Sequence, residues 1–168
     1  MSAQLYLHPL TWIAPAWMMG SARIDSAQPR MTDPIPAQLV AELFFAIKML
    51  SGYPVPEVPP PVHRLPRAEL EAMICRTACG VKAFYLKGKG VYIDEALDPV
   101  HDLNARSILL HELVHHVQGE TGKFDTMPDC HGWYAKEHEA YSIQNRYLRW
   151  EGSSVNFYMN SGWRDCRK

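Results

Sequence analysis

The residues best placed to do chemistry are two histidines and a glutamate in the run His111-Glu112-Leu113-Val114-His115. Histidines four residues apart lie one turn apart on the same face of a helix, so both imidazoles can reach one metal ion. A carboxylate beside the first histidine can polarise a water molecule bound to that metal. The spacing therefore predicts a metal centre that hydrolyses its substrate.

The residues around this run predict the helix that positions it. Asp102 or Asn104 can cap the N-terminus, and no Pro or Gly interrupts the chain before Gly119. A broad apolar surface is formed by Ile108, Leu109, Leu110, Leu113, Val114 and Val117. We therefore expect a largely buried helix over residues 102–119, whose polar groups need partners. His116 and Gln118 are expected to pack or to orient neighbouring side chains rather than to bind the metal.

Two histidines and a water leave a catalytic zinc one protein ligand short. In metzincins a third histidine stands six residues after the second, and that position here is Thr121. The remaining candidates lie in a second predicted helix over residues 133–150. Glu137 and Glu139 lie on different faces of it, and Glu137 shares its face with Tyr141, Gln144 and Leu148.

Residues 104–119 and 133–149 together resemble gluzincins, the zinc metallopeptidases whose third ligand is a glutamate on a later helix. The core His-Glu-Leu-Val-His-His-Val-Gln followed by Glu-x-Glu-Ala also resembles small bacterial families of this type. Aligning the family pattern on Ala140 makes Glu137 the third ligand, with Glu139 as the alternative. The pattern usually has Asp or Asn at the position of Tyr141, so the residue that orients a zinc histidine is open.

The resemblance implies one zinc ion per chain, held by His111, His115 and Glu137, in a small zincin-like α+β domain. It also implies cleavage of a peptide or protein substrate, in which Glu112 activates the zinc-bound water and passes its proton to the leaving amine. Four side chains are candidates for the donor to the developing oxyanion: His138, Tyr141, Tyr134 and Tyr158. Two other functions stay open: a catalytically silent zinc-binding or structural domain, and a zinc hydrolase of non-peptide amides.

The elements before the metal helix predict a mostly helical domain over residues 31–168. A helix is expected over residues 36–51, an extended Pro-rich connector over 54–66 and a second helix over 67–79. Residues 82–94 predict a β-hairpin around a Gly-containing turn. By analogy with the resembled class, its second strand, residues 91–94, is a candidate edge for an extended substrate; the alternative is a hairpin that only covers the core.

Composition excludes several partner classes. With 47% hydrophobic residues and a net charge of −1, the 168-residue chain gives no electrostatic reason to expect nucleic acid. It contains no run of 18 apolar residues that predicts an integral membrane segment. Residues 1–30 include an apolar stretch that makes a poor secretory signal, because no Lys or Arg precedes Arg23 and Pro15 interrupts it.

The four cysteines are candidates for disulfide bonds. Cys75 and Cys79, placed one turn apart on the predicted helix, would not face each other, so each is expected to pair with Cys130 or Cys166. Such bridges would suit a periplasmic or secreted protein. Free thiols in a cytoplasmic protein are one alternative, and a structural zinc on Cys75, Cys79, Cys130 and His131 is another.

Overall fold

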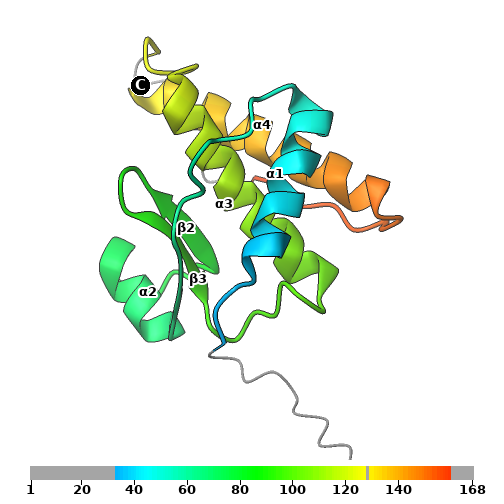
Figure 1. The fold of residues 1–168 in the computed structure, drawn as a ribbon. Helices are drawn as coiled ribbons and strands as arrows, with labels where there is room; N and C mark the ends of the chain where they lie inside the picture. The colour runs from blue at the N-terminus through cyan, green and yellow to red at the C-terminus, as the bar shows by residue number, and fades with distance from the viewer. Residues whose placement is uncertain (1–32, 128, 160–168) are drawn as a thin grey trace, which may run out of the picture.

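The computed structural model describes residues 33–127 and 129–159 (Figure 1). Its elements, in chain order, are α1 (Ala37–Ser51), β1 (Val62–Leu65), α2 (Arg67–Ile74), β2 (Ala83–Leu86), β3 (Gly90–Asp94), α3 (Leu103–Thr121) and α4 (Asp129–Trp150). The mixed α+β architecture and the order of helix, connector, helix, hairpin and two further helices confirm the prediction. The signal-like stretch within residues 1–30 lies outside the described residues.

The small sheet has the order β1-β3-β2, with β1 parallel and β2 antiparallel to β3. The sequence did not predict β1, which lies inside the Pro-rich connector. The chain can approach β3 there because Gly90 has no side chain: a Cβ on Gly90 would lie 2.4 Å from the carbonyl oxygen of Pro61. Pairing on both sides makes β3 the central strand, so the prediction that residues 91–94 form the substrate edge is wrong. Within the hairpin, the strand with a free edge is β2.

α3 is the central element of the fold. Figure 1 shows it between the sheet on one side and α1 and α4 on the other. The side chain of Asp102 caps its first turn by accepting the N–H of Asn104 at 2.8 Å. Four aliphatic side chains of this helix are fully buried: Leu109, Leu110, Leu113 and Val114. The predicted burial of this helix is confirmed, and its polar residues are therefore buried with it.

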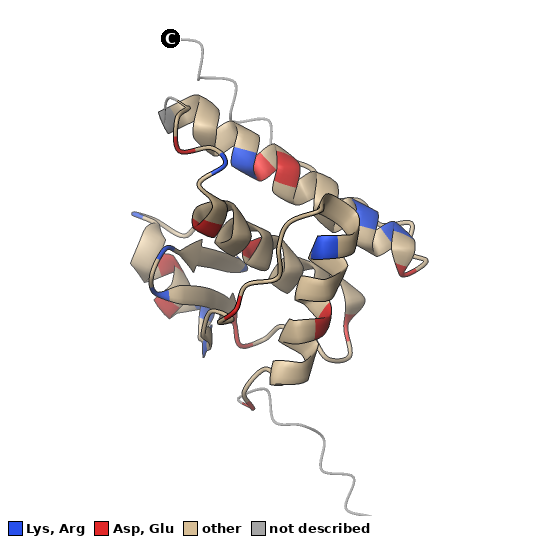
Figure 2. Cartoon of the chain, turned by 45° about the horizontal axis from the view of Figure 1, so that its top comes forward, with Lys and Arg blue, Asp and Glu red and all other residues tan. Residues whose placement is uncertain are grey.

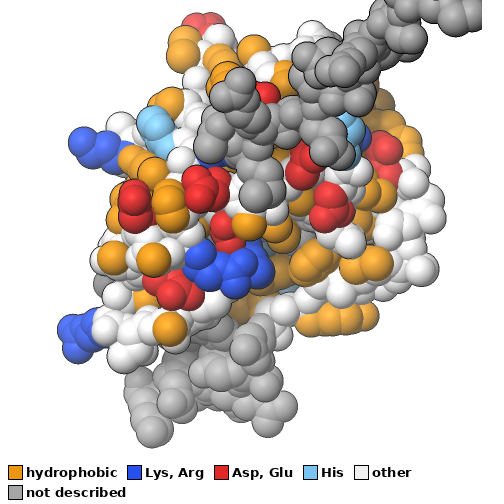
Figure 3. Space-filling view, turned by 90° about the horizontal axis from the view of Figure 1, so that it is seen from below, with side chains coloured by type: hydrophobic (Ala, Val, Ile, Leu, Met, Phe, Trp, Pro, Cys, Tyr) orange, Lys and Arg blue, Asp and Glu red, His pale blue; other side chains and the backbone are white. Residues whose placement is uncertain are grey.

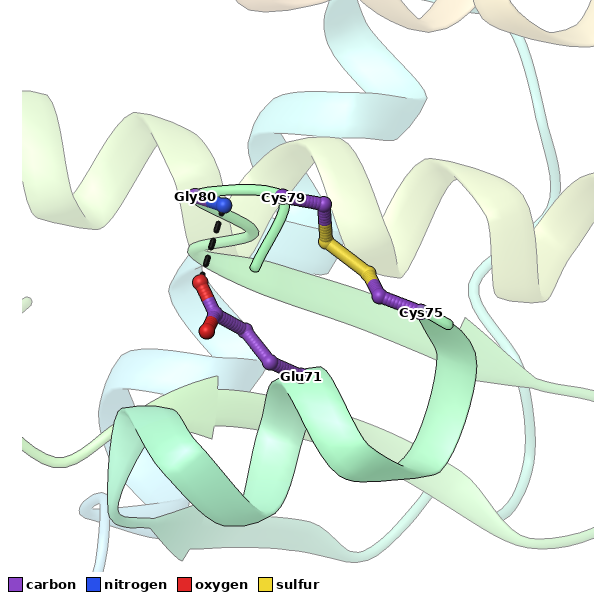
Figure 4. The surroundings of a disulfide bond; sticks show 4 residues. All are labelled: Glu71, Cys75, Cys79 and Gly80. Atoms are coloured by element: carbon purple, nitrogen blue, oxygen red, sulfur yellow. Dashed lines mark hydrogen bonds between the residues drawn. A yellow bond between two sulfur atoms is a disulfide. The ribbon is translucent and has the colours of Figure 1, made fainter. Parts of the chain in front are cut away.

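α2 lies on the opposite face of the sheet from α3 (Figure 1). It ends at Ile74 rather than continuing to residue 79, because Cys75 is extended (φ −113°, ψ 146°). The Glu71 carboxylate accepts the N–H of Gly80 and helps to turn the chain back (Figure 4). This reversal places the Cα atoms of Cys75 and Cys79 6.3 Å apart, and the two residues form a disulfide.

The prediction that these two cysteines pair elsewhere is therefore wrong, since it assumed a helix that continues through both. Cys130 is also disulfide-bonded, whereas Cys166 lies outside the described residues. The described cysteines are thus neither free thiols nor ligands of a structural zinc.

A buried ion pair ties the start of α2 to the end of β3. The Asp94 side chain is 2% exposed, and its Oδ2 accepts the Nε and Nη2 groups of Arg67 at 2.9 and 2.6 Å. Its Oδ1 accepts the N–H of Ala96. Burial raises the pKa of the Asp94 carboxyl, but the Ala96 N–H and the Arg67 guanidinium outweigh it and hold that pKa below its ordinary value.

Charged residues of both signs are interspersed along the chain (Figure 2). On the face seen from below, basic side chains lie beside acidic ones, with apolar side chains between them (Figure 3). Among the described residues, no helix combines the length and the apolar character needed to cross a membrane.

Candidate metal centre

Three potential ligand atoms converge between α3 and α4. The Nε2 atoms of His111 and His115 lie 3.1 Å apart. The Glu137 carboxylate lies 3.3 Å from the first of them and 3.1 Å from the second. His111, His115 and Glu137 thus form a group that could hold a metal ion, and the group is largely buried.

The Nδ1 atom of His111, on the side of the ring away from Glu137, contacts a glutamine that the sequence did not assign to the site. Its Nδ1 lies 3.0 Å from Oε1 of Gln144, whose Nε2 donates to the Ser107 hydroxyl at 3.0 Å. That hydroxyl donates to the carbonyl of Asn104, a group that only accepts. The donor and acceptor of every hydrogen bond in this series are therefore fixed, and His111 must donate from Nδ1.

His115 is held in the same way by Gln118. Its Nδ1 lies 2.8 Å from Oε1 of Gln118, and the Nε2 of that amide donates to the carbonyl of Lys136 and to the carboxylate of Glu139. Both of these partners accept, so the amide nitrogen must face them and the amide oxygen must face His115. The expectation that Gln118 orients a neighbour is confirmed.

Because each imidazole donates from Nδ1, its neutral form presents a lone pair at Nε2. Two such lone pairs and a carboxylate then face one another at hydrogen-bond distance, so either a proton on an imidazole, which donates to Glu137, or a metal ion must lie between them. Burial lowers the pKa of His115, but the hydrogen bond to Glu137 and the charges of Glu112 and Glu137 outweigh it and raise that pKa to about 9. Burial likewise raises the pKa of Glu137, but its hydrogen bonds to the two histidines lower it to about 2. The centre therefore attracts positive charge, and two imidazoles with one carboxylate suit zinc.

Glu112 lies beside this group at the wall of a cleft of about 540 Å³. Its side chain is buried, and burial raises the pKa of its carboxyl. The backbone N–H of Tyr85, on β2, faces this carboxylate and offsets a small part of that rise. The Glu112 carboxylate therefore lies against the edge strand.

The free edge of the sheet runs along the same cleft, which Ala83, Phe84 and Tyr85 line. In the register of β2 with β3, Lys82 pairs with Asp94 through a backbone hydrogen bond, so the backbone groups of Ala83 and Tyr85 point away from β3. Gly119, one turn beyond His115 on α3, lines the cleft opposite Tyr85. A second hollow of about 300 Å³ adjoins the centre at His111 and Glu112.

Of the four candidate oxyanion donors, the structure brings Tyr141 to the cleft. Its ring centroid lies 4.5 Å from that of His111, and burial together with the charges of Glu137 and Glu112 raises the pKa of its phenol. His138 and Tyr134 instead stack on each other and line a separate shallow hollow. Tyr158 is 79% exposed.

The structure separates the two glutamates that the sequence left as alternatives for the third ligand. Glu137 joins the histidines, whereas the Glu139 carboxylate binds Tyr53, Gln118 and Lys123. The position that the family pattern assigns to an orienting Asp or Asn is Tyr141, and Gln144 performs that role instead. Its seven-residue spacing from Glu137, two helical turns on the same face, is the signal that would have identified it.

No protein-family model matches this chain, and neither a curated protein nor a solved structure shows significant similarity to it.

Proposed function

We propose that this chain is a zinc-dependent metallopeptidase with a zincin-like arrangement of its site. The observation that carries the proposal is the pair of glutamines, Gln144 and Gln118, which hold both imidazoles with Nε2 toward Glu137. Buried polar networks of this kind cost free energy unless every member has a partner. A zinc ion held by His111, His115 and Glu137 would complete the network.

A zinc ion held by His111, His115 and Glu137 would supply Lewis-acid chemistry: it would polarise the scissile carbonyl and acidify the attacking water. Glu112 takes a proton from that water on its carboxylate and delivers it to the nitrogen of the leaving amine. Burial raises the pKa of the Glu112 carboxyl, which makes the carboxylate a stronger base toward the water than an exposed glutamate. Tyr141 keeps its phenolic proton and donates it as a hydrogen bond to the developing oxyanion.

The substrate proposed is a peptide in an extended conformation. Ala83 and Tyr85 offer backbone groups along the cleft, and an added strand would take them up by main-chain hydrogen bonds. The amide of Tyr85 faces the Glu112 carboxylate, so an added strand at this edge would lie directly beside the general base.

The test combines metal content with peptide cleavage. We expect about one zinc per chain after dialysis, retained in Glu112→Gln, which should lose cleavage of an unbiased peptide mixture. His115→Ala should lose the zinc, and the matched control His138→Ala, an exposed histidine outside the cleft, should keep both zinc and activity. Wild-type protein without zinc would refute the metal centre. Stoichiometric zinc without any cleavage would refute the peptidase and favour a silent zinc-binding domain.

We also infer that the chain functions in an oxidising compartment, as a periplasmic or secreted protein does. Cys75 and Cys79 form a disulfide, and Cys130 is disulfide-bonded as well. Alkylation of the protein taken directly from its native compartment should leave these cysteines unmodified. Modification of all three would refute the inference.

A further inference from the structure

The Glu139 carboxylate, two residues after the proposed third ligand, receives hydrogen bonds from three side chains that lie far from it in the sequence. Tyr53, which follows α1, donates its hydroxyl to Oε2 at 2.6 Å, and the amide of Gln118 on α3 donates to the same oxygen at 3.1 Å. Lys123, after the end of α3, donates to Oε1 at 2.5 Å. Tyr53 is buried, and the ammonium of Lys123 lies 5.2 Å from its ring centroid.

The two carboxylate oxygens of Glu139 make different contacts. Oε1 meets only the half-exposed Lys123, an arrangement that contributes little to stability. Oε2 accepts a hydrogen bond from one N–H of the Gln118 amide, and the carbonyl of Lys136 accepts one from the other. With both hydrogens engaged, the amide oxygen has a single orientation, which faces Nδ1 of His115.

We propose that Glu139 is a positioning residue for the metal centre, which acts through Gln118 to keep His115 a ligand through Nε2. Tyr53 keeps the carboxylate in place, so the chain after α1 supports a metal ligand 62 residues away through two intervening side chains. The proposal rests on the metal centre of the proposed function and does not depend on peptide hydrolysis.

The effect of losing Glu139 should be partial, because the Lys136 carbonyl still engages one amide hydrogen. Loss of a direct partner of a metal-ligating histidine lowers metal affinity about 10- to 100-fold. Glu139 is one step further from the metal and contributes one ordinary hydrogen bond. Its loss should therefore lower the zinc affinity roughly three- to tenfold.

The experiment measures zinc affinity by competition with a chromophoric chelator in the full chain. Glu139→Met keeps the side-chain length and removes the acceptor, and it should weaken zinc binding roughly three- to tenfold. Glu139→Gln is the rescue variant: its amide oxygen can occupy the Oε2 position and accept from Tyr53 and Gln118, while its NH₂ cannot accept from Lys123, so only the half-exposed Oε1 contact is lost and affinity should stay within about twofold of wild type. Lys123→Met, which removes the Oε1 contact and the ammonium beside the Tyr53 ring but leaves both hydrogen bonds to Oε2, should do the same.

A double-mutant cycle separates this role from a general loss of stability. In a Gln118→Leu background, Glu139→Met should have no further effect on zinc affinity, although it still lowers the thermal midpoint. Unchanged zinc affinity in Glu139→Met, or an equal loss in both backgrounds, would overturn the proposal. Wild-type protein that binds no zinc would overturn the centre and this role together.

If Glu139→Met does not fold, the side-chain amide of Gln118 in the wild-type protein decides. Its two protons should be resolved in the NMR spectrum and slow to exchange with solvent, because both are hydrogen-bonded. Rapidly exchanging protons would show that Gln118 is not held and would overturn the proposal.

Discussion

Gly119 lies inside α3, where a glycine is costly, and it faces the cleft. A glycine within a helix is less stable than alanine by about 0.5–1 kcal/mol. A Cβ at this position would meet Cε1 and the hydroxyl of Tyr85 at 3.6 Å, an ordinary van der Waals distance, and the backbone has no positive φ. Gly119→Ala should therefore stabilise the protein by about 0.5–1 kcal/mol and raise the thermal midpoint by roughly 1–4 °C.

The same methyl group should impair function, because it narrows the cleft between α3 and the edge strand one turn from His115. We expect lower kcat/KM for peptide cleavage with unchanged zinc content. Gly132→Ala is the matched control: it sits in α4, and its Cβ would lie 3.2 Å from that of Met127 and 3.4 Å from two carbonyl oxygens. This crowding should cancel the gain in helix propensity.

The assay is urea denaturation of wild type and both variants, read by far-UV circular dichroism. A destabilised Gly119→Ala would refute the reasoning that this glycine is there to leave space. A stabilised variant with undiminished peptide cleavage would show that the substrate does not pass this part of the cleft.

Three further outcomes are expected. Gln144→Leu should weaken zinc binding about 10- to 100-fold by chelator competition, because it frees the outer nitrogen of His111; an unchanged affinity would remove Gln144 from the site. Saturating zinc at 100 times its Kd should stabilise the wild type by about 2.7 kcal/mol in urea denaturation; chelation should reverse this, and His115→Ala should show neither effect. Asp94→Asn should cost about 1–3 kcal/mol at neutral pH. Because the folded-state pKa of Asp94 is depressed, its contribution is present above the ordinary value of 3.8 and is lost as pH falls through the lower, folded-state value. Denaturation curves of variant and wild type should therefore converge toward low pH, and a constant difference would contradict this assignment.

Helices α3 and α4 could be predicted because their sequence patterns are local. Apolar residues at helical spacing around His111 and His115 required a buried helix. The resemblance to the gluzincin pattern, aligned on Ala140, favoured Glu137 and left Glu139 as the alternative. The orienting glutamines were harder to predict, since a glutamine in a helix is also an ordinary surface residue. The sequence shows that Gln144 shares a helix face with Glu137, but only the structure shows that this face is buried at Gln144.

The errors concern contacts that depend on distant parts of the chain. A hairpin pattern shows that β2 and β3 pair, but it does not show which of them meets a third strand. That strand, β1, is formed by residues that follow three consecutive prolines and have little strand signal of their own. The end of α2 at Ile74 also lacks a stop signal before Gly80, and the prediction for Cys75 and Cys79 failed with it.

The metal centre belongs to one contiguous stretch of the chain. The proposed ligands, both orienting glutamines, Glu112, Tyr141 and Glu139 all lie between residues 104 and 144, in the antiparallel pair formed by α3 and α4. Contacts between neighbouring segments form quickly because little loop entropy is lost, whereas the parallel pairing of β1 with β3 must close a longer loop. The helical pair should therefore form a cooperative folding unit able to capture its metal before the sheet completes the cleft. Amides of α3 and α4 should then exchange together with solvent, and more slowly than those of β1.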